Sequence, residues 1–156
     1  KFNPVKIELV KQVSNVISLV EIQAINKDIS IYNNVYHNLY VNADINMLNT
    51  ILRNLLSNGI KFTKPEGEIH ISSSIKDNFV TVSIRDNGVG MTQDCIENLF
   101  NIENKNCSIG TANEQGSGLG LILCKDFIEK NGGKIKVKST LDKGSEFLFS
   151  LPVYQE

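Results

Sequence analysis

The stretch Gly116-Ser117-Gly118-Leu119-Gly120-Leu121 places three glycines at alternate positions, and an apolar helical pattern follows it directly. Glycine leaves backbone N–H groups open to a ligand, and the N-terminus of a following helix carries a partial positive charge. Such an arrangement suits a phosphate group. Glycine-rich turns before helices also form for purely structural reasons, so the stretch alone leaves both interpretations open.

Length and composition indicate one globular domain over residues 1–156, with 41% hydrophobic and 21% charged residues. The net charge of −1 lacks the basic excess of a general nucleic-acid binder. No apolar run approaches the ~20 residues of a membrane helix. Cys95, Cys107 and Cys124 are odd in number and not closely paired, which favours a reduced, intracellular compartment over a disulfide framework or zinc site. Lys1 in place of Met indicates a fragment of a longer chain.

Hydrophobic periodicity predicts helices over residues 8–26, from Asp44 or Asn46 to Phe62, and over 119–131. We expect a short helix at 93–99 and strands at 29–32, 39–41, 68–74, 79–85, 134–139 and 146–151, with a polar turn at Asn33-Asn34 between the first two. Residues 100–115 show no apolar period, which is typical of a mobile lid or a disordered loop. This order predicts an α+β fold: a two-layer α/β sandwich with one mixed, mainly antiparallel sheet of about five strands and three main helices on one face.

Three polar side chains share one face of the predicted helix that ends at Phe62. Asn54, Asn58 and Lys61 stand at i, i+4 and i+7, away from the apolar stripe of that helix. An asparagine carbonyl is a suitable Mg²⁺ ligand, and a lysine one turn further on can reach a phosphate. The alternative is a solvated helix face on which the asparagines stand by chance.

The segment Asp86-Asn87-Gly88-Val89-Gly90-Met91 follows directly on a predicted strand. A carboxylate at a strand end can accept a hydrogen bond from an exocyclic amine such as adenine N6, and close glycines let a flat ring approach the backbone. Gly90 and Met91 suit an apolar slot for that ring. A simple turn is the alternative, because Asp and Gly are common turn residues. Neither a P-loop nor a dinucleotide-binding glycine motif is present in the chain.

Four segments, taken in order, carry a family resemblance: Asn54-Leu55-Leu56-Ser57-Asn58-Gly59-Ile60-Lys61-Phe62-Thr63, Asp86 to Met91, Gly116 to Leu121, and Gly144-Ser145-Glu146-Phe147. The chain resembles the catalytic ATP-binding domain of sensor histidine kinases. That domain is a branch of the gyrase/Hsp90/histidine-kinase/MutL superfamily, which has the Bergerat fold. The resemblance covers nearly the whole chain.

The resemblance implies a Mg-ATP site. Asn58 matches the asparagine that coordinates Mg²⁺, and Asn54 matches the position that lines the phosphate site and assists the chemistry. Lys61 matches the basic residue near the phosphates, Phe62 the aromatic residue beside the base or ribose, and Asp86 the aspartate that reads adenine. Asn54, Asn58 and Lys61 are thus the implied catalytic residues. The implied nucleotide-binding set is Asn54, Asn58, Lys61, Phe62, Asp86, Gly88, Gly90, Met91, Lys105, Gly116, Ser117, Gly118, Leu119, Gly120 and Leu121.

Two details distinguish this chain within the superfamily. Asn54 stands where the hydrolysing relatives place a glutamate, and an amide cannot take a proton from water. The chain therefore resembles the phosphotransfer branch. Gly59 stands where the family often has alanine, which costs the helix about 1 kcal/mol. Residues 100–115 match the ATP lid, in which Lys105 is the only cation.

The implied function is transfer of the ATP γ-phosphoryl group to a histidine on a separate helical dimerisation domain, for relay to the receiver domain of a response regulator. Neither His37 nor His70 lies on a predicted helix, so the acceptor belongs to another part of a longer, homodimeric kinase. The resemblance implies a cytoplasmic domain without direct membrane contact, in a parent that is a candidate for anchoring in the bacterial inner membrane. Two alternatives stay open: a serine kinase of the anti-sigma-factor type, and a degenerate nucleotide-binding module.

Overall fold

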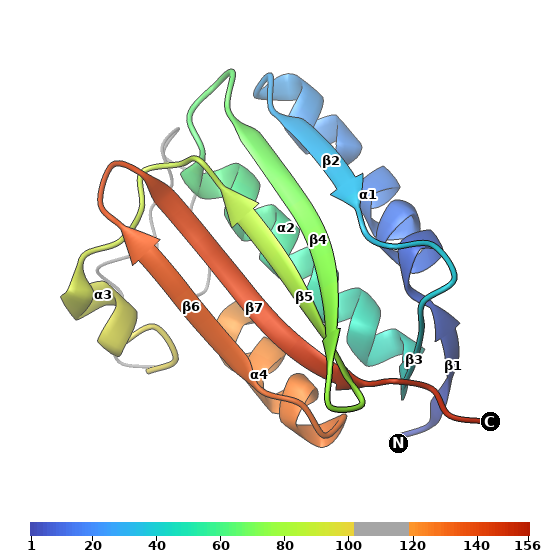
Figure 1. Ribbon diagram of the computed structural model, residues 1–156. Helices are drawn as coiled ribbons and strands as arrows, with labels where there is room; N and C mark the ends of the chain where they lie inside the picture. The colour runs from blue at the N-terminus through green and yellow to red at the C-terminus, as the bar shows by residue number, and fades with distance from the viewer. Residues whose placement is uncertain (102–118) are drawn as a thin grey trace.

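The computed structural model describes residues 1–101 and 119–156 (Figure 1). The described elements are β1 (Pro4–Glu8), α1 (Leu9–Asn26), β2 (Ser30–Asn34), β3 (Tyr40–Asp44), α2 (Ile45–Phe62), β4 (Glu68–Lys76), β5 (Phe79–Asp86), α3 (Gln93–Glu97), α4 (Gly120–Lys130), β6 (Ile135–Thr140) and β7 (Gly144–Pro152). Apart from Phe100 and Asn101, the predicted lid lies outside these residues. Within them, no helix combines the length and apolar character that crossing a bilayer requires.

The main sheet has five strands in the order β2-β4-β5-β7-β6. β2 and β4 run parallel, and the other neighbouring strands pair antiparallel. Figure 1 shows α1, α2 and α4 together on one face of this sheet. The predicted two-layer sandwich with three main helices on one face is therefore confirmed.

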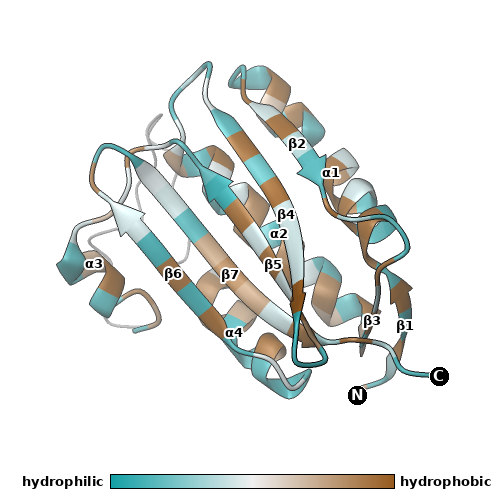
Figure 2. Ribbon diagram, in the orientation of Figure 1, coloured by the Kyte–Doolittle hydropathy of each residue, from teal (hydrophilic) through white to brown (hydrophobic). Residues whose placement is uncertain are grey.

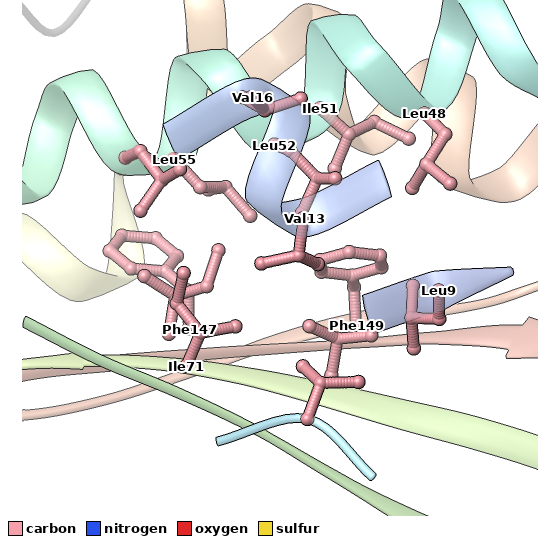
Figure 3. Close-up of a cluster of buried hydrophobic side chains, with 14 of the residues drawn as sticks. Leu9, Val13, Val16, Leu48, Ile51, Leu52, Leu55, Ile71, Phe147 and Phe149 are labelled. Carbon is pink, nitrogen blue, oxygen red and sulfur yellow. The ribbon is translucent and has the colours of Figure 1, made fainter. Parts of the chain in front are cut away.

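The core lies between the helices and the covered face of the sheet. Along the strands, hydrophobic and hydrophilic residues alternate (Figure 2), as expected for a sheet with one buried face. Figure 3 shows side chains of α1 and α2 meeting side chains that rise from the sheet. The fully or almost fully buried set includes Leu9, Val13, Val16, Leu48, Ile51, Leu52, Leu55, Ile71, Phe147 and Phe149. Burying each of these side chains contributes about 1.5–3 kcal/mol, which holds α2 firmly on the sheet.

A second, two-stranded sheet corrects the prediction of a single sheet. β3 pairs antiparallel with β1, a strand that the sequence did not predict. The expected polar turn at Asn33-Asn34 is wrong, because both residues lie in β2. The Asn33 amide accepts a hydrogen bond from the Val35 backbone N–H at 3.2 Å and donates to the Val10 carbonyl at 3.1 Å. Its polar side chain thus ties β2 to α1 instead of forming a turn.

Both ends of α2 are fixed by side chains. At the N-terminus Asp44 Oδ1 accepts from the backbone N–H groups of Asn46 at 3.0 Å and Met47 at 3.1 Å. Hydrogen bonds from backbone N–H groups, that of Asn3 foremost, hold the pKa of Asp44 below its usual value. At the C-terminus Lys27 Nζ donates to the carbonyls of Ile60 at 2.9 Å and Lys61 at 3.0 Å. These contacts set the position of the polar face of α2.

The cysteines depart from the expectation drawn from their spacing. Cys95 in α3 is disulfide-bonded, which departs from the expectation of reduced cysteines without a disulfide framework. Cys124 in α4 is a free and buried thiol.

Candidate nucleotide site

Asp86 ends β5 as a buried carboxylate with a side that remains open to a donor. Its Oδ1 accepts hydrogen bonds from the backbone N–H groups of Gly88 at 2.9 Å and Ser145 at 3.2 Å. Within the described part of the chain no hydrogen bond reaches Oδ2, although only 7% of the residue is exposed. Burial raises the pKa of Asp86, and the two backbone hydrogen bonds oppose that rise. Such an oxygen is suited to accept a hydrogen bond from a ligand amine.

The glycines after Asp86 are required by close backbone contacts. A Cβ on Gly88 would lie 2.2 Å from the Phe62 carbonyl oxygen, and the Val89 N–H donates to that same oxygen at 3.0 Å. Gly90 has φ +70°, and a Cβ there would lie 2.0 Å from the Thr140 carbonyl oxygen. The loop is therefore pressed between the end of α2 and the end of β6, where no larger residue fits.

The hairpin between β6 and β7 packs against the loop that follows Asp86. The Met91 N–H donates to Ser139 Oγ at 2.8 Å, and the Asp142 N–H donates to the Val89 carbonyl at 2.6 Å. Gly144 has φ +114°, and a Cβ there would lie 2.1 Å from the carbonyl oxygen of Asp86. Sequence reasoning assigned Ser139 no role, because only the pairing of β5 with β7 and of β7 with β6 brings it to the loop.

Asn54, Asn58 and Lys61 are half-buried side chains of α2. Asn54 Nδ2 donates to the backbone carbonyl of Gly120 at 3.4 Å, so the structure brings the second helix to the start of α4. The Asn58 side chain makes no hydrogen bond within residues 1–101 and 119–156, which leaves its amide oxygen available. Lys61 Nζ lies 5.1 Å from the centre of the Phe62 ring, a cation–π contact at the end of the helix.

The glycine stretch is described only at its C-terminal end. Leu119 precedes α4 and is 49% exposed, while Leu121 packs half-buried against the core. Lys105, Gly116, Ser117 and Gly118 lie outside the described residues. Among residues 1–101 and 119–156 no group of three or more His, Cys, Asp or Glu side chains is placed to hold a metal ion. The amide oxygen of Asn58 is a hard-oxygen donor of the kind that Mg²⁺ accepts.

Cys124 lies one turn after Gly120 in α4 and faces α2. Its thiol donates to the Ile51 carbonyl at 3.8 Å. Burial raises the pKa of the thiol to about 11, although a hydrogen bond with Asn54 has the opposite, smaller effect. The thiol therefore stays protonated near neutral pH and packs beside Asn54. Nothing in the sequence pattern marked this contact, because it depends on how α4 packs against α2.

A surface hollow of about 350 Å³ lies at the opposite end of β5 from Asp86. It is lined by Asn42, Asn78, Phe79, Pro152, Val153, Tyr154 and Gln155. None of these side chains is charged, so the hollow lacks the groups that a nucleotide phosphate requires.

The chain is similar to known proteins in both sequence and fold. The family described as "Histidine kinase-, DNA gyrase B-, and HSP90-like ATPase" matches residues 43–155. Sensor protein SrrB of Staphylococcus aureus (strain NCTC 8325 / PS 47) is 38% identical over 102 residues, which cover 65% of this chain and 18% of that protein. The chain thus spans about a fifth of the length of the curated relatives that it matches.

Two solved structures share the fold over nearly the whole chain. The nucleotide-free catalytic domain of histidine kinase ThkA has a TM-score of 0.83 at 27% identity, covering 96% of this chain and 95% of that one. Full-length ShkA in complex with AMPPNP has a TM-score of 0.83 at 26% identity, covering 100% of this chain and 32% of that one.

Proposed function

This chain belongs to the histidine kinase-, DNA gyrase B-, and HSP90-like ATPase family, and we propose that it binds Mg-ATP and donates the γ-phosphoryl group to a histidine on a separate helical domain. The parent is a two-component sensor kinase that acts as a homodimer and relays the phosphoryl group to a response regulator. This domain lies in the cytoplasm and contacts neither the membrane nor nucleic acid.

The observation that carries the proposal is the environment of Asp86. Two backbone N–H groups hold Oδ1, and Oδ2 has no partner within the described residues. Gly88 and Gly90 let the loop after Asp86 pack directly against the backbone of Phe62 and Thr140, which holds the loop close to the carboxylate. An adenine N6 amine supplies the donor that Oδ2 lacks, and the likeness to ShkA, which was solved with AMPPNP, supports a nucleotide here.

The side chains of α2 fit the phosphate half of the ligand. The amide oxygen of Asn58 is a hard-oxygen donor, and Mg²⁺ takes its remaining ligands from water and phosphate. When bound, the metal offsets negative charge on the phosphates during transfer. Lys61 adds a positive charge at the end of the same helix. Asn54 is held by Gly120 and cannot act as a base toward water, which favours transfer over hydrolysis.

The acceptor histidine lies elsewhere in the parent protein. His70 lies on β4, where its ring stacks on Tyr32 with centroids 4.7 Å apart and Nε2 lies 3.0 Å from Glu68 Oε1. His37 lies in a turn between β2 and β3. Neither is on a helix, and the chain contains no other histidine. Transfer therefore requires a supplied acceptor domain.

Calorimetric titration with AMPPNP, with and without Mg²⁺, tests the nucleotide site. We expect Mg²⁺-dependent binding that weakens at least tenfold in Asp86→Asn, because a hydrogen bond to a charged group is lost. Asp77→Asn is the matched control: the same substitution in an exposed turn at the other end of β5, which leaves affinity unchanged. No binding by the wild-type chain, or equal affinity in Asp86→Asn, would overturn the adenine assignment.

Phosphotransfer from γ-labelled ATP to an added acceptor-helix domain tests the reaction. We expect acid-labile label on histidine, which is lost when Asn58→Ala replaces the wild-type chain. Acid-stable label on serine would instead indicate a serine kinase, and nucleotide binding without any transfer would indicate an inert module.

A further inference from the structure

Ser139 on β6 is a half-buried serine that joins three parts of the candidate site. Its Oγ accepts from the Met91 N–H at 2.8 Å and lies 3.0 Å from the Gly144 carbonyl oxygen and 2.8 Å from Ser145 Oγ. Ser145 in turn pairs with Asp86 across β5 and β7 and donates its backbone N–H to Asp86 Oδ1. Ser139 thus connects the loop after Asp86 with the carboxylate itself.

The single hydroxyl proton on each of Ser139 and Ser145 determines which partner donates in each of these hydrogen bonds. A hydroxyl has one proton and two lone pairs. The Met91 N–H can only donate and the Gly144 carbonyl can only accept. All three contacts of Ser139 are satisfied together only when Ser139 donates to Gly144 and accepts from both Met91 and the Ser145 hydroxyl. The Ser145 hydroxyl then has no proton left, and its Oγ presents lone pairs only.

We infer that Ser139 is a positioning residue that turns the Ser145 hydroxyl into an acceptor, so that the site prefers a purine with an exocyclic amine to one with an oxo group at the same position. Asp86 and Ser145 are directly opposite each other on β5 and β7, so their side chains lie on the same face of the sheet. Asp86 Oδ2 and Ser145 Oγ are then two acceptors that match the hydrogens of an amine and oppose the lone pairs of an oxo group. This inference rests on the proposed function, because it requires the base to meet Asp86. Without Ser139 the Ser145 hydroxyl is free to rotate and donate to an oxo group.

Calorimetric titration with ADP and IDP, whose bases differ by an amine and an oxo group, tests this role. The wild-type chain is expected to bind ADP more tightly than IDP. In Ser139→Ala the ratio of the two dissociation constants is expected to fall about tenfold, as one hydrogen bond changes direction. Ser139→Thr keeps the hydroxyl and should keep the ratio. Ser150→Ala is the matched control, because Ser150 Oγ also accepts a backbone N–H, that of Lys134 at 2.9 Å, at the far end of the same hairpin.

Ser145→Ala gives a second, independent reading, because it removes the acceptor and leaves the contact of Ser139 with Met91 in place. It should lower the same ratio. If the wild-type chain binds ADP but folded Ser139→Ala has an unchanged ratio of IDP to ADP dissociation constants, the inference is overturned. If Ser139→Ala does not fold, an unchanged ratio in Ser145→Ala overturns it instead. A wild-type chain that binds neither nucleotide overturns the proposed function itself.

Discussion

The side-chain amide of Asn54 on α2 donates to the backbone carbonyl of Gly120, 3.4 Å away at the first residue of α4. The contact links the helix that carries the predicted phosphate residues to the end of the glycine stretch. It also explains why an amide suits this position. An amide can donate to a carbonyl oxygen, whereas a carboxylate can only accept.

Asn54→Ala should lower the free energy of unfolding by about 1 kcal/mol, the net value of one neutral hydrogen bond. Asn54→Asp should lower it further, because a carboxylate would face the lone pairs of the Gly120 carbonyl. Urea unfolding measures both, with Thr50→Ala on the same helix as a control for a solvent-exposed local hydrogen bond. Equal stability of the Asp variant and the wild-type chain would contradict the contact.

Asp86→Asn should stabilise the nucleotide-free domain at pH 7 although it weakens nucleotide binding. The folded pKa of Asp86 lies above its usual value of 3.8 because of burial, so the folded state binds more protons than the unfolded state between these two values. Stability therefore falls as pH rises through that window, and the ionised carboxylate is unfavourable at pH 7. Asparagine keeps an oxygen for the N–H groups of Gly88 and Ser145 and carries no charge.

Urea unfolding at several pH values tests this sign. The stability difference between Asp86→Asn and wild type should be largest at pH 7 and shrink as pH falls to 3.8 and below. A difference that grows on acidification would show that the carboxylate is stabilised in the fold.

Lys27→Met should destabilise the domain by about 1–3 kcal/mol, because the ammonium group caps the C-terminal carbonyls of Ile60 and Lys61. Methionine keeps an apolar stem of similar length. Hydrogen exchange should accelerate at the end of α2 and at the amide of Val89, which donates to the Phe62 carbonyl. Lys11→Met, at an exposed position of α1, is the control and should change neither measurement; Lys27 directly follows that helix.

Gly59→Ala should have two opposing effects on stability, a gain from helix propensity and a loss from a steric contact with Ile69. Alanine favours the helix by about 1 kcal/mol, but a Cβ at Gly59 would lie 2.9 Å from Cδ1 of Ile69. The substitution Ile69→Val removes that atom. In a double-mutant cycle, Gly59→Ala should therefore be more stabilising in the chain that carries Ile69→Val, by about 0.5 kcal/mol or more. Additive effects would mean that the two positions do not touch.

Much of the fold follows from local patterns. The apolar stripe of α2 and the alternation in β4 and β5 depend on residues close in sequence, and the predicted bounds agree with the structure to within a few residues. The turn after β4 is likewise local, because Asp77 and Asn78 tolerate the positive φ angles, 52° and 66°, that they adopt. The strands 29–32 and 39–41 were located nearly correctly, whereas β1, the partner of β3, was not predicted.

Some features of the candidate site also follow from local sequence, whereas others depend on tertiary packing. Short-range spacing was enough to predict a glycine-containing turn at the strand end that begins at Asp86. It also predicted that Asn54, Asn58 and Lys61 share a helix face. Long-range packing, in contrast, decides that β1 pairs with β3, that Asn54 meets Gly120, and that Ser139 and Ser145 stand beside Asp86. Strand register and helix packing join residues far apart in the chain, and no local pattern encodes which distant partner each one meets.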